Sequence, residues 1–400
     1  MANTPNIRFK GYTDDWEQRK LGDMVSFSKG SGYSKGDLKE NGTPIILYGR
    51  LYTKYETIIS EVDTFVDEKK GSVYSKGGEV IVPASGETAE DISIASVVEK
   101  SGVLLGGDLN VITPPEDMDS AFLAISISNG KPHNDMAKMA QGKSVVHLHN
   151  SDLAKIDLPY PSYDEQRRIS GFFYDLDNLI TLHQRKCEQT KQLKKYMLQK
   201  MFPKNGGSVP EIRFSGFTDD WEQRKVGDFL SESREIGHKG DIAQKITVKL
   251  WGKGVFKKDD AGSSNTQYFI RHANQFIYSK LDFLNCAFGV VPDELEGLET
   301  TADVPAFDCD GINPKFLYYI AIQPSFYLKN GMIADGSRKA KRIHADAFLE
   351  MPLCVPTIEE QEKIVNYFDS LDNLITLHLR KCNELKEVKK YMLQNMFPKA

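Results

Sequence analysis

The chain contains two long segments that each occur twice, and this repetition constrains its fold more than any other feature. Residues 7–23 (IRFKGYTDDWEQRKLGD) return at 212–228 with 14 of 17 positions identical. Residues 176–204 return at 371–399 with 22 of 29 positions identical. Because repeated segments of this length mark repeated structural units, we predict two half-proteins, and 400 residues provide enough chain for each to have its own core.

The segments between the repeated blocks differ from each other. The two copies are offset by 205 residues at the first block and by 195 at the second, so the variable segment 229–352 is ten residues shorter than the segment 24–157. The repeated blocks predict one task that is performed twice, and the dissimilar segments between them predict two different targets.

The second repeated block predicts a long helix in each half. Ser162 with Glu165, and Thr357 with Glu360, form a capping-box pattern, and each helix is expected to end at Pro203 or Pro398. We therefore predict helices over 161–203 and 356–398, each roughly 60 Å long.

Apolar residues in both helices recur at alternating spacings of four and three, which is typical of a helix-pairing seam. The predicted pairing residues are Ile169, Phe173, Leu176, Ile180, Ile364, Phe368, Leu371 and Ile375. An antiparallel pair that spaces the variable domains is the favoured interpretation; a helical hairpin that only adds stability is the alternative.

The variable segments show strand-like runs, such as 79–83 and 245–250, and a helix is expected near 119–128 and near 314–323. The predicted fold class is α+β: two α/β domains separated by two long antiparallel coiled-coil helices, with an internal pseudo-twofold repeat. The predicted domains are 1–160, the central helix 161–204, 205–355, and the C-terminal helix 356–400.

Composition narrows the class of protein. The chain is 27% charged with a net charge of −5, which argues against a non-specific nucleic-acid binder and leaves room for local basic patches. Residues 1–20 lack the apolar core of a signal peptide and no window matches a membrane helix, so we expect a cytoplasmic protein with no membrane contact. Five cysteines without a C-x-x-C spacing predict reduced thiols.

Motifs for catalysis are incomplete. The run 113–116 (TPPE) lacks the polar and aromatic ends of a methyltransferase loop, and 142–144 (GKS) lacks the first glycine of a P-loop. Asp63, Glu68 and Lys70 imitate a nuclease pattern that has no equivalent in the second half. We predict no catalytic residue, no metal site and no cofactor in this chain.

Basic and aromatic residues beside glycine turns favour contact with DNA instead. Two loops stand about six residues before His149 and His344, in matching places of the two halves. The candidate DNA-contacting residues are Tyr48, Arg50, Tyr52, Lys54, Ser85, Lys143, Ser144 and His149 in the first half, and Lys249, Trp251, Lys253, Lys280, Arg338, Lys339, Lys341, Arg342 and His344 in the second.

The duplicated IRF-x-G-[YF]-TDDWEQRK block and the duplicated LDNLITLH-x-RKC…KKYMLQ-x-MFPK block resemble the specificity subunit of a type I DNA restriction–modification system. The resemblance covers the whole chain in its order of variable segment, helix, variable segment, helix. It implies a non-catalytic subunit whose two target recognition domains each read one half of a bipartite, asymmetric site in double-stranded DNA.

The resemblance also implies the partners. Two modification subunits transfer a methyl group from S-adenosylmethionine to adenine, and two restriction subunits use ATP and Mg²⁺, so these cofactors are expected on the partners. Three alternatives stay open: a specificity subunit whose partner is a fused nuclease-methylase, an adaptor that binds two copies of a protein without DNA, and a self-sufficient nuclease.

Overall fold

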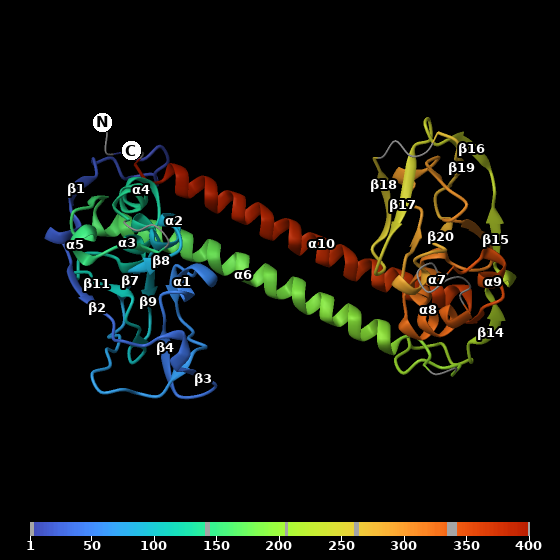
Figure 1. Ribbon diagram of the computed structural model, residues 1–400, viewed down its shortest axis with the longest axis horizontal. Coiled ribbons are helices and arrows are strands. Elements are labelled where there is room, and N and C mark those ends of the chain that lie inside the picture. Colours follow the sequence, from blue (N-terminus) through green and yellow to red (C-terminus); the bar gives the residue numbers. More distant parts are fainter. Residues whose placement is uncertain (1–3, 141–144, 205–206, 260–263, 334–341, 399–400) are drawn as a thin grey trace. The chain divides into compact units, whose positions relative to one another are not determined.

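The computed structural model describes residues 4–140, 145–204, 207–259, 264–333 and 342–398. The chain forms two compact units (Figure 1). Unit 1 contains residues 1–184 and 379–400, and unit 2 contains residues 185–378. Neither unit coincides with one half of the sequence, because unit 1 includes residues 379–400 and unit 2 begins at residue 185.

Unit 1 is built on two small sheets, with strand orders β2-β11-β7-β9-β5 and β10-β4-β6-β3, and two strand pairs, β1-β13 and β8-β12. Its strands are β1 (Glu17–Lys20), β2 (Ser26–Lys29), β3 (Leu38–Lys39), β4 (Thr43–Ile46), β5 (Ile58–Ile59), β6 (Phe65–Val66), β7 (Glu79–Pro83), β8 (Ser85–Gly86), β9 (Ser96–Val98), β10 (Leu104–Leu105), β11 (Leu109–Thr113), β12 (Val146–His147) and β13 (Asp157–Tyr160). Its short helices are α1 (Arg50–Thr53), α2 (Ala89–Ile92), α3 (Ser120–Ile127), α4 (Gly130–Met139) and α5 (Asn150–Leu153).

Unit 2 has sheets with strand orders β15-β23-β20-β21 and β16-β19-β22-β17-β18, and one strand pair, β14-β24. Its strands are β14 (Glu222–Lys225), β15 (Leu230–Ser233), β16 (Ile236–Lys239), β17 (Lys245–Lys249), β18 (Gly254–Lys258), β19 (Gln267–Ile270), β20 (Phe276–Tyr278), β21 (Phe288–Val290), β22 (Glu299–Thr300), β23 (Ala306–Cys309) and β24 (Pro352–Val355). Its short helices are α7 (Pro314–Ala321), α8 (Pro324–Asn330) and α9 (Ala345–Leu349).

The two predicted long helices are confirmed as α6 (Tyr163–Lys200) and α10 (Ile358–Asn395). Each begins in one unit and ends in the other. Within each unit the start of one helix lies beside the end of the other, and an ion pair fixes the register: Lys389 to Asp177 at 2.5 Å in unit 1, and Lys194 to Asp372 at 2.6 Å in unit 2. In the part of the chain that the structure describes, no helix is long and apolar enough to cross a membrane.

The first repeated block locks the start of each helix. Both oxygens of the Glu165 carboxylate accept hydrogen bonds from the Arg8 guanidinium, at 2.6 and 2.7 Å, and Arg213 holds Glu360 in the same way at 2.7 and 2.8 Å. Both glutamates are buried. The two carboxylates that the sequence places in capping boxes thus also serve as buried anchors for an arginine of the first repeated block.

The last residues of each helix segment complete the aromatic core of the unit in which they end. In unit 1 the Phe397 ring lies 6.1 Å from Trp16, 6.0 Å from Phe122 and 6.2 Å from Phe173, between ring centroids. In unit 2 the Phe202 ring meets the equivalent partners Trp221, Phe316 and Phe368, at 5.8 to 6.2 Å. The predicted pseudo-twofold repeat is thus present in the packing as well as in the sequence.

Most residues predicted to pair the helices are buried, and they also contact the core of an α/β domain. Ile169, Phe173 and Leu176 belong to one core cluster with Trp16 and with Phe397. Ile364, Phe368 and Leu371 belong to the equivalent cluster of unit 2. These positions therefore fasten each helix to its α/β domain as well as to the other helix, while Ile180 is buried and Ile375 is half-buried further along.

Candidate nucleic-acid interface

The same backbone arrangement places a polar surface at equivalent positions of the two units. In unit 1 the Ala84 carbonyl accepts from Leu148 N–H at 3.0 Å, and Ala84 N–H donates to Asp108 at 2.9 Å. In unit 2 Lys280 makes the same two backbone bonds, with Ile343 at 3.1 Å and with Asp303 at 2.9 Å. His149 and His344 then precede the first turns of α5 and α9. His149 and His344 thus occupy equivalent places in the two units, whereas residues 142–144 and 339–341, whose correspondence the sequence predicts, lie outside the described residues.

In unit 1 this surface carries hydroxyl and imidazole groups. The buried Ser85 hydroxyl lies 3.1 Å from Nδ1 of His147. The exposed rings of His147 and His149 are parallel, with centroids 6.5 Å apart. His147 was not among the predicted contacts, although its offset of 195 residues from Arg342 was a signal that could have found it. These groups donate and accept hydrogen bonds without bringing a permanent positive charge.

Two tyrosines predicted for this interface form a pair. The Tyr48 and Tyr52 rings meet edge to face with centroids 6.1 Å apart. Burial, and then the neighbouring Tyr48 with the carboxylates of Asp91 and Glu87, raise the pKa of Tyr52 to about 12. The Tyr52 phenol therefore stays neutral at physiological pH and can donate a hydrogen bond to a base edge or a phosphate.

Arg50 is placed differently from the other predicted contacts. Its guanidinium binds the carboxylates of Asp63 at 2.5 Å and Glu56 at 2.7 Å and the Glu61 carbonyl at 2.8 Å, and its side chain is only 8% exposed. A cation with this many partners holds the 50–63 loop together, so the structure favours a folding role over the predicted contact with DNA.

The neighbouring Lys54 contrasts with Arg50. It also pairs with Asp63, at 2.9 Å, and half of its side chain is exposed. The hydrogen bond from Lys54 and the contact with Arg50 lower the pKa of Asp63 to about 2. Lys54 is therefore the cation of this loop that solvent can reach, and Asp63, tied to both cations, is no free nuclease ligand.

In unit 2 the equivalent surface is basic. Lys280 is half-buried, and the exposed Arg342 lies where unit 1 has His147, with its guanidinium 3.8 Å from Asp303. His344 is exposed. Lys249, Trp251 and Lys253 stand together, all exposed, at the turn between β17 and β18. The predicted contacts Lys143, Ser144, Arg338, Lys339 and Lys341 lie outside the described residues.

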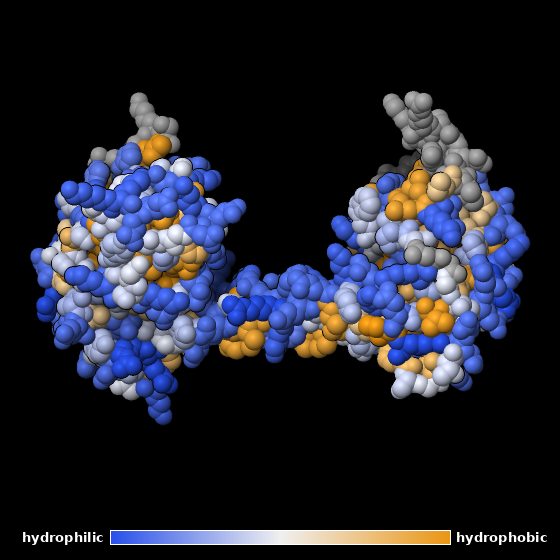
Figure 2. Space-filling model, turned by 90° about the horizontal axis from the view of Figure 1, so that it is seen from below, coloured by the Kyte–Doolittle hydropathy of each residue, from blue (hydrophilic) through white to orange (hydrophobic). Residues whose placement is uncertain are grey.

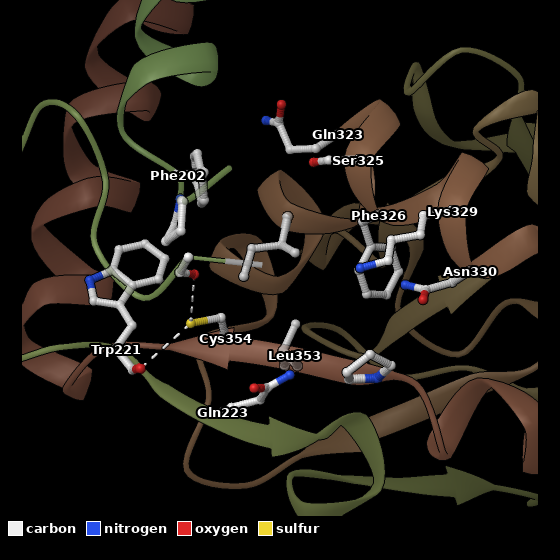
Figure 3. Close-up of a pocket in the computed structure, with 14 residues that line it drawn as sticks. Phe202, Trp221, Gln223, Gln323, Ser325, Phe326, Lys329, Asn330, Leu353 and Cys354 are labelled. Carbon is white, nitrogen blue, oxygen red and sulfur yellow. Dashed lines mark hydrogen bonds between the residues drawn. The ribbon is translucent and has the colours of Figure 1, made fainter. Parts of the chain in front are cut away.

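A pocket of about 350 Å³ in unit 2 contains a cysteine and is one place where catalysis could be sought (Figure 3). Phe202, Trp221 and Phe326 supply its aromatic walls. The Cys354 thiol points to the carbonyl oxygens of Trp221 and Gly207, at 3.6 and 3.9 Å, and burial raises its pKa. A thiol whose pKa is raised by burial is not activated as a nucleophile.

Metal binding has no support in the described residues either. Within the ranges that the structure describes, no group of three His, Cys, Asp or Glu side chains is arranged to hold a metal ion. The groups that the structure does place at these surfaces are hydrogen-bonding, charged and aromatic side chains.

A second kind of surface lies on the long helices. Leu179 and Leu182 of α6, with Val388 and Tyr391 of α10, are exposed in unit 1. Their repeat equivalents Leu374, Leu377, Leu193 and Tyr196 are exposed in unit 2. Figure 2 shows apolar patches on the surface of the helical segments. The same set of exposed apolar residues therefore recurs at equivalent positions of the two units.

Comparisons with known proteins agree with this architecture. A family model described as the type I restriction modification DNA specificity domain matches residues 13–192 and, again, residues 218–387. The specificity subunit of the type I restriction enzyme MjaVIII of Methanocaldococcus jannaschii is 21% identical over 95% of this chain and 91% of its own length.

A second relative and one solved structure extend these matches. The putative MjaX specificity subunit of the same organism is 23% identical over 95% of this chain and 92% of its own length. The crystal structure of the type I restriction–modification S subunit of M. genitalium covers 99% of this chain and 100% of that one, with 14% identity and a TM-score of 0.61. That structure therefore shares the fold.

Proposed function

The chain belongs to the family of type I restriction–modification specificity subunits, and we propose that its two domains each read one half of a bipartite, asymmetric DNA sequence. The observation that carries this proposal is the contrast between a repeated frame and divergent surfaces. The arginine–glutamate anchors and the aromatic cores are the same in both units, whereas equivalent surface positions carry His147 in one unit and Arg342 in the other.

The two surfaces favour different modes of DNA reading. Unit 1 offers hydrogen-bonding groups from Tyr52, Ser85 and His147. Unit 2 offers Arg342 and lysines, and an arginine can bond both O6 and N7 of guanine in the major groove. Two domains with unlike donor sets support a target whose two halves differ in sequence.

We further propose that the exposed helix residues dock two copies of a modification subunit. The set Leu179, Leu182, Val388 and Tyr391 in unit 1 has a repeat equivalent at every position in unit 2. One partner can therefore bind twice in the same way. On this proposal the chain supplies specificity and scaffolding, while adenine methylation from S-adenosylmethionine, and ATP-driven cleavage with Mg²⁺ by two restriction subunits, take place on the partners.

The sequence-reading proposal is tested by producing the chain with its candidate methyltransferase and mapping methylated adenines on genomic DNA. We expect a split motif with two unequal halves, and only one half should change when residues 24–157 are exchanged for the same segment of a relative. A stable complex that methylates no defined motif would contradict DNA reading and favour the two-site adaptor.

The docking proposal is tested by native mass spectrometry of the same complex. Leu182→Glu in unit 1 should remove one of two bound modification subunits, the matched Leu377→Glu in unit 2 should remove one as well, and the double variant should bind none. The physical reason is that a carboxylate placed in an apolar interface loses its hydration without gaining a partner. Two copies retained in the double variant would refute this surface.

A further inference from the structure

Trp251 is the one tryptophan of the three in this chain that is exposed, at 64% of its surface, whereas Trp16 and Trp221 are each 2% exposed. It stands at the turn between β17 and β18, and its backbone has φ of +63°. Left-handed backbone is rare and energetically unfavourable for a bulky residue. A large aromatic ring is thus displayed to solvent at a position where glycine or asparagine is the usual residue.

Specific contacts hold this turn in place. The N–H groups of Trp251 and Gly252 donate to the carbonyls of Asn285 and Cys286, both at 2.8 Å. The Tyr318 hydroxyl donates to the Gly252 carbonyl at 2.6 Å. Residues 285 and 286 lie between β20 and β21, and Tyr318 belongs to α7, so two other segments of unit 2 support the turn. The ring is therefore presented by a fixed backbone.

The hairpin is positively charged around the ring. Lys249, Lys253 and Lys257 are exposed, and among the described residues no carboxylate pairs with any of them. The Lys249 ammonium lies 3.8 Å from the centre of the Phe256 ring, on the same face of the β17–β18 pair. A basic two-stranded ribbon with exposed aromatic rings complements the phosphates and the base faces of DNA.

We propose that Trp251 enters the base stack of duplex DNA and stacks on a base of the half-site that unit 2 reads. The lysines of the hairpin would bind the flanking phosphates while the indole wedges between neighbouring base pairs, as apolar side chains do in proteins that kink DNA. This inference rests on the proposed function and deepens it, because it names how one half-site is read.

The exposed aromatic ring on a left-handed backbone belongs to unit 2. Within the described residues, the non-glycine residues with positive φ are Trp251, Asn274 and Cys286, and all three belong to unit 2. Unit 1 presents Tyr48 and Tyr52 as a mutually packed pair instead. We therefore expect DNA deformation in the half-site of unit 2, at steps that unstack readily.

The first experiment uses Trp251 as its own probe in the complex with the modification subunit. Quenching of tryptophan fluorescence by iodide is measured for the wild type and for Trp251→Phe. The difference between the two gives the fluorescence that comes from Trp251. Adding duplex DNA that carries the methylated motif should shield Trp251 from iodide. Shielding by the modification subunit before DNA is added would show that the ring lies in a protein interface and would overturn the proposal.

The second experiment places 2-aminopurine at successive positions of the unit 2 half-site, outside the target adenine, because the methyltransferase itself flips that base. The wild type and Trp251→Phe should brighten the probe at one step. Trp251→Asn, which keeps a residue that tolerates left-handed backbone, should abolish that signal and weaken DNA binding by about 5- to 150-fold, the range for loss of one base–aromatic stack.

A matched control removes another exposed apolar side chain of the same unit. Leu328, 49% exposed on α8, is changed to Gln and should alter neither signal. If the wild-type complex methylates a split motif but no probe position responds to Trp251, the stacking proposal fails and the proposed function stands. If no split motif is methylated by the wild type, the proposed function itself fails.

Discussion

Replacing Phe397 with alanine should destabilise unit 1, although most of that unit lies more than 200 residues earlier in the chain. The Phe397 ring is 5% exposed and contacts Trp16, Phe122 and Phe173 with centroids about 6 Å away. Truncation of a buried phenylalanine to alanine costs about 3–5 kcal/mol. A domain is stable by about 5–15 kcal/mol, so this single change removes a large share of the stability of unit 1.

Hydrogen exchange read by mass spectrometry resolves the effect by unit, which a global melting curve of a two-unit chain does not. In Phe397→Ala, the amides of β7 and β11 should exchange roughly two to four orders of magnitude faster, since 1.4 kcal/mol is a factor of ten. The amides of β20 and β23 in unit 2 should keep their rates. Methylation should lose the half-site that unit 1 reads.

Phe202→Ala is the matched variant, because Phe202 occupies the equivalent place against Trp221, Phe316 and Phe368. It should accelerate exchange in β20 and β23 and leave β7 and β11 unchanged. If Phe397→Ala accelerates both units equally, or leaves β7 and β11 unaffected, then the helix ends do not complete the cores as described here and the reasoning is refuted.

Three further predictions concern buried and paired charges. Arg8→Ala should lower the free energy of unfolding of unit 1 by about 3–5 kcal/mol, because it leaves Glu165 buried without its partner. The double change Arg8→Met with Glu165→Met should recover most of that loss, which a denaturation series measures. Arg50→Met should lower the melting temperature of unit 1, because it loses hydrogen bonds worth about 1–2 kcal/mol. Lys54→Met should weaken DNA binding and leave the melting temperature unchanged. If instead Arg50→Met weakens DNA binding and Lys54→Met lowers the melting temperature, Arg50 is the DNA contact. Hydrogen bonds from Glu235 and then Glu296 raise the pKa of His272. The stability that this cluster contributes is therefore complete below the ordinary histidine pKa of about 6.5 and is lost as pH rises through the raised value. The melting temperature of unit 2 should fall as pH rises through this range, and His272→Asn should flatten that dependence.

The elements carried by the repeated blocks could be predicted from sequence, because two copies of one pattern report the same structure twice. Both long helices begin two residues inside the predicted bounds and end three residues inside them. The exchange of helix ends between the units was not predicted. The MFPK sequence signals a helix stop, and nothing in its pattern says that Phe397 packs on Trp16 while Phe202 packs on Trp221.

The candidate site could be predicted by region and less well by residue. In the sequence Arg50 lies beside aromatic residues and a glycine, which suits a DNA contact. The sequence does not show that the carboxylates of Glu56 and Asp63 both pair with its guanidinium. Trp251 was selected for its neighbours, Lys249 and Lys253. The sequence does not predict the left-handed backbone of Trp251. A pattern assigns that conformation to the adjacent Gly252, because glycine adopts it without strain.

The position of the length difference between the halves locates where the two domains diverge. The halves are offset by 205 residues at the first repeated block, by 196 between Ala84 and Lys280, and by 195 between His149 and His344. Nine of the ten residues of difference therefore lie before residue 84. That is the region in which unit 1 carries Tyr48 and Tyr52 while unit 2 carries the Trp251 hairpin.

Described positions that correspond between the units after residue 84, such as Leu148 with Ile343 and His149 with His344, share a backbone framework, while neighbouring side chains differ, as His147 differs from Arg342. A domain built in this way can alter its DNA reading by two separate routes. Point substitutions on the constant framework replace one hydrogen-bonding group by another, and exchange of the early strands replaces the whole contact surface. Exchange of residues 24–83 alone should then change more bases of the half-site than any single substitution at His147, and equal effects would show that the early strands serve folding and not recognition.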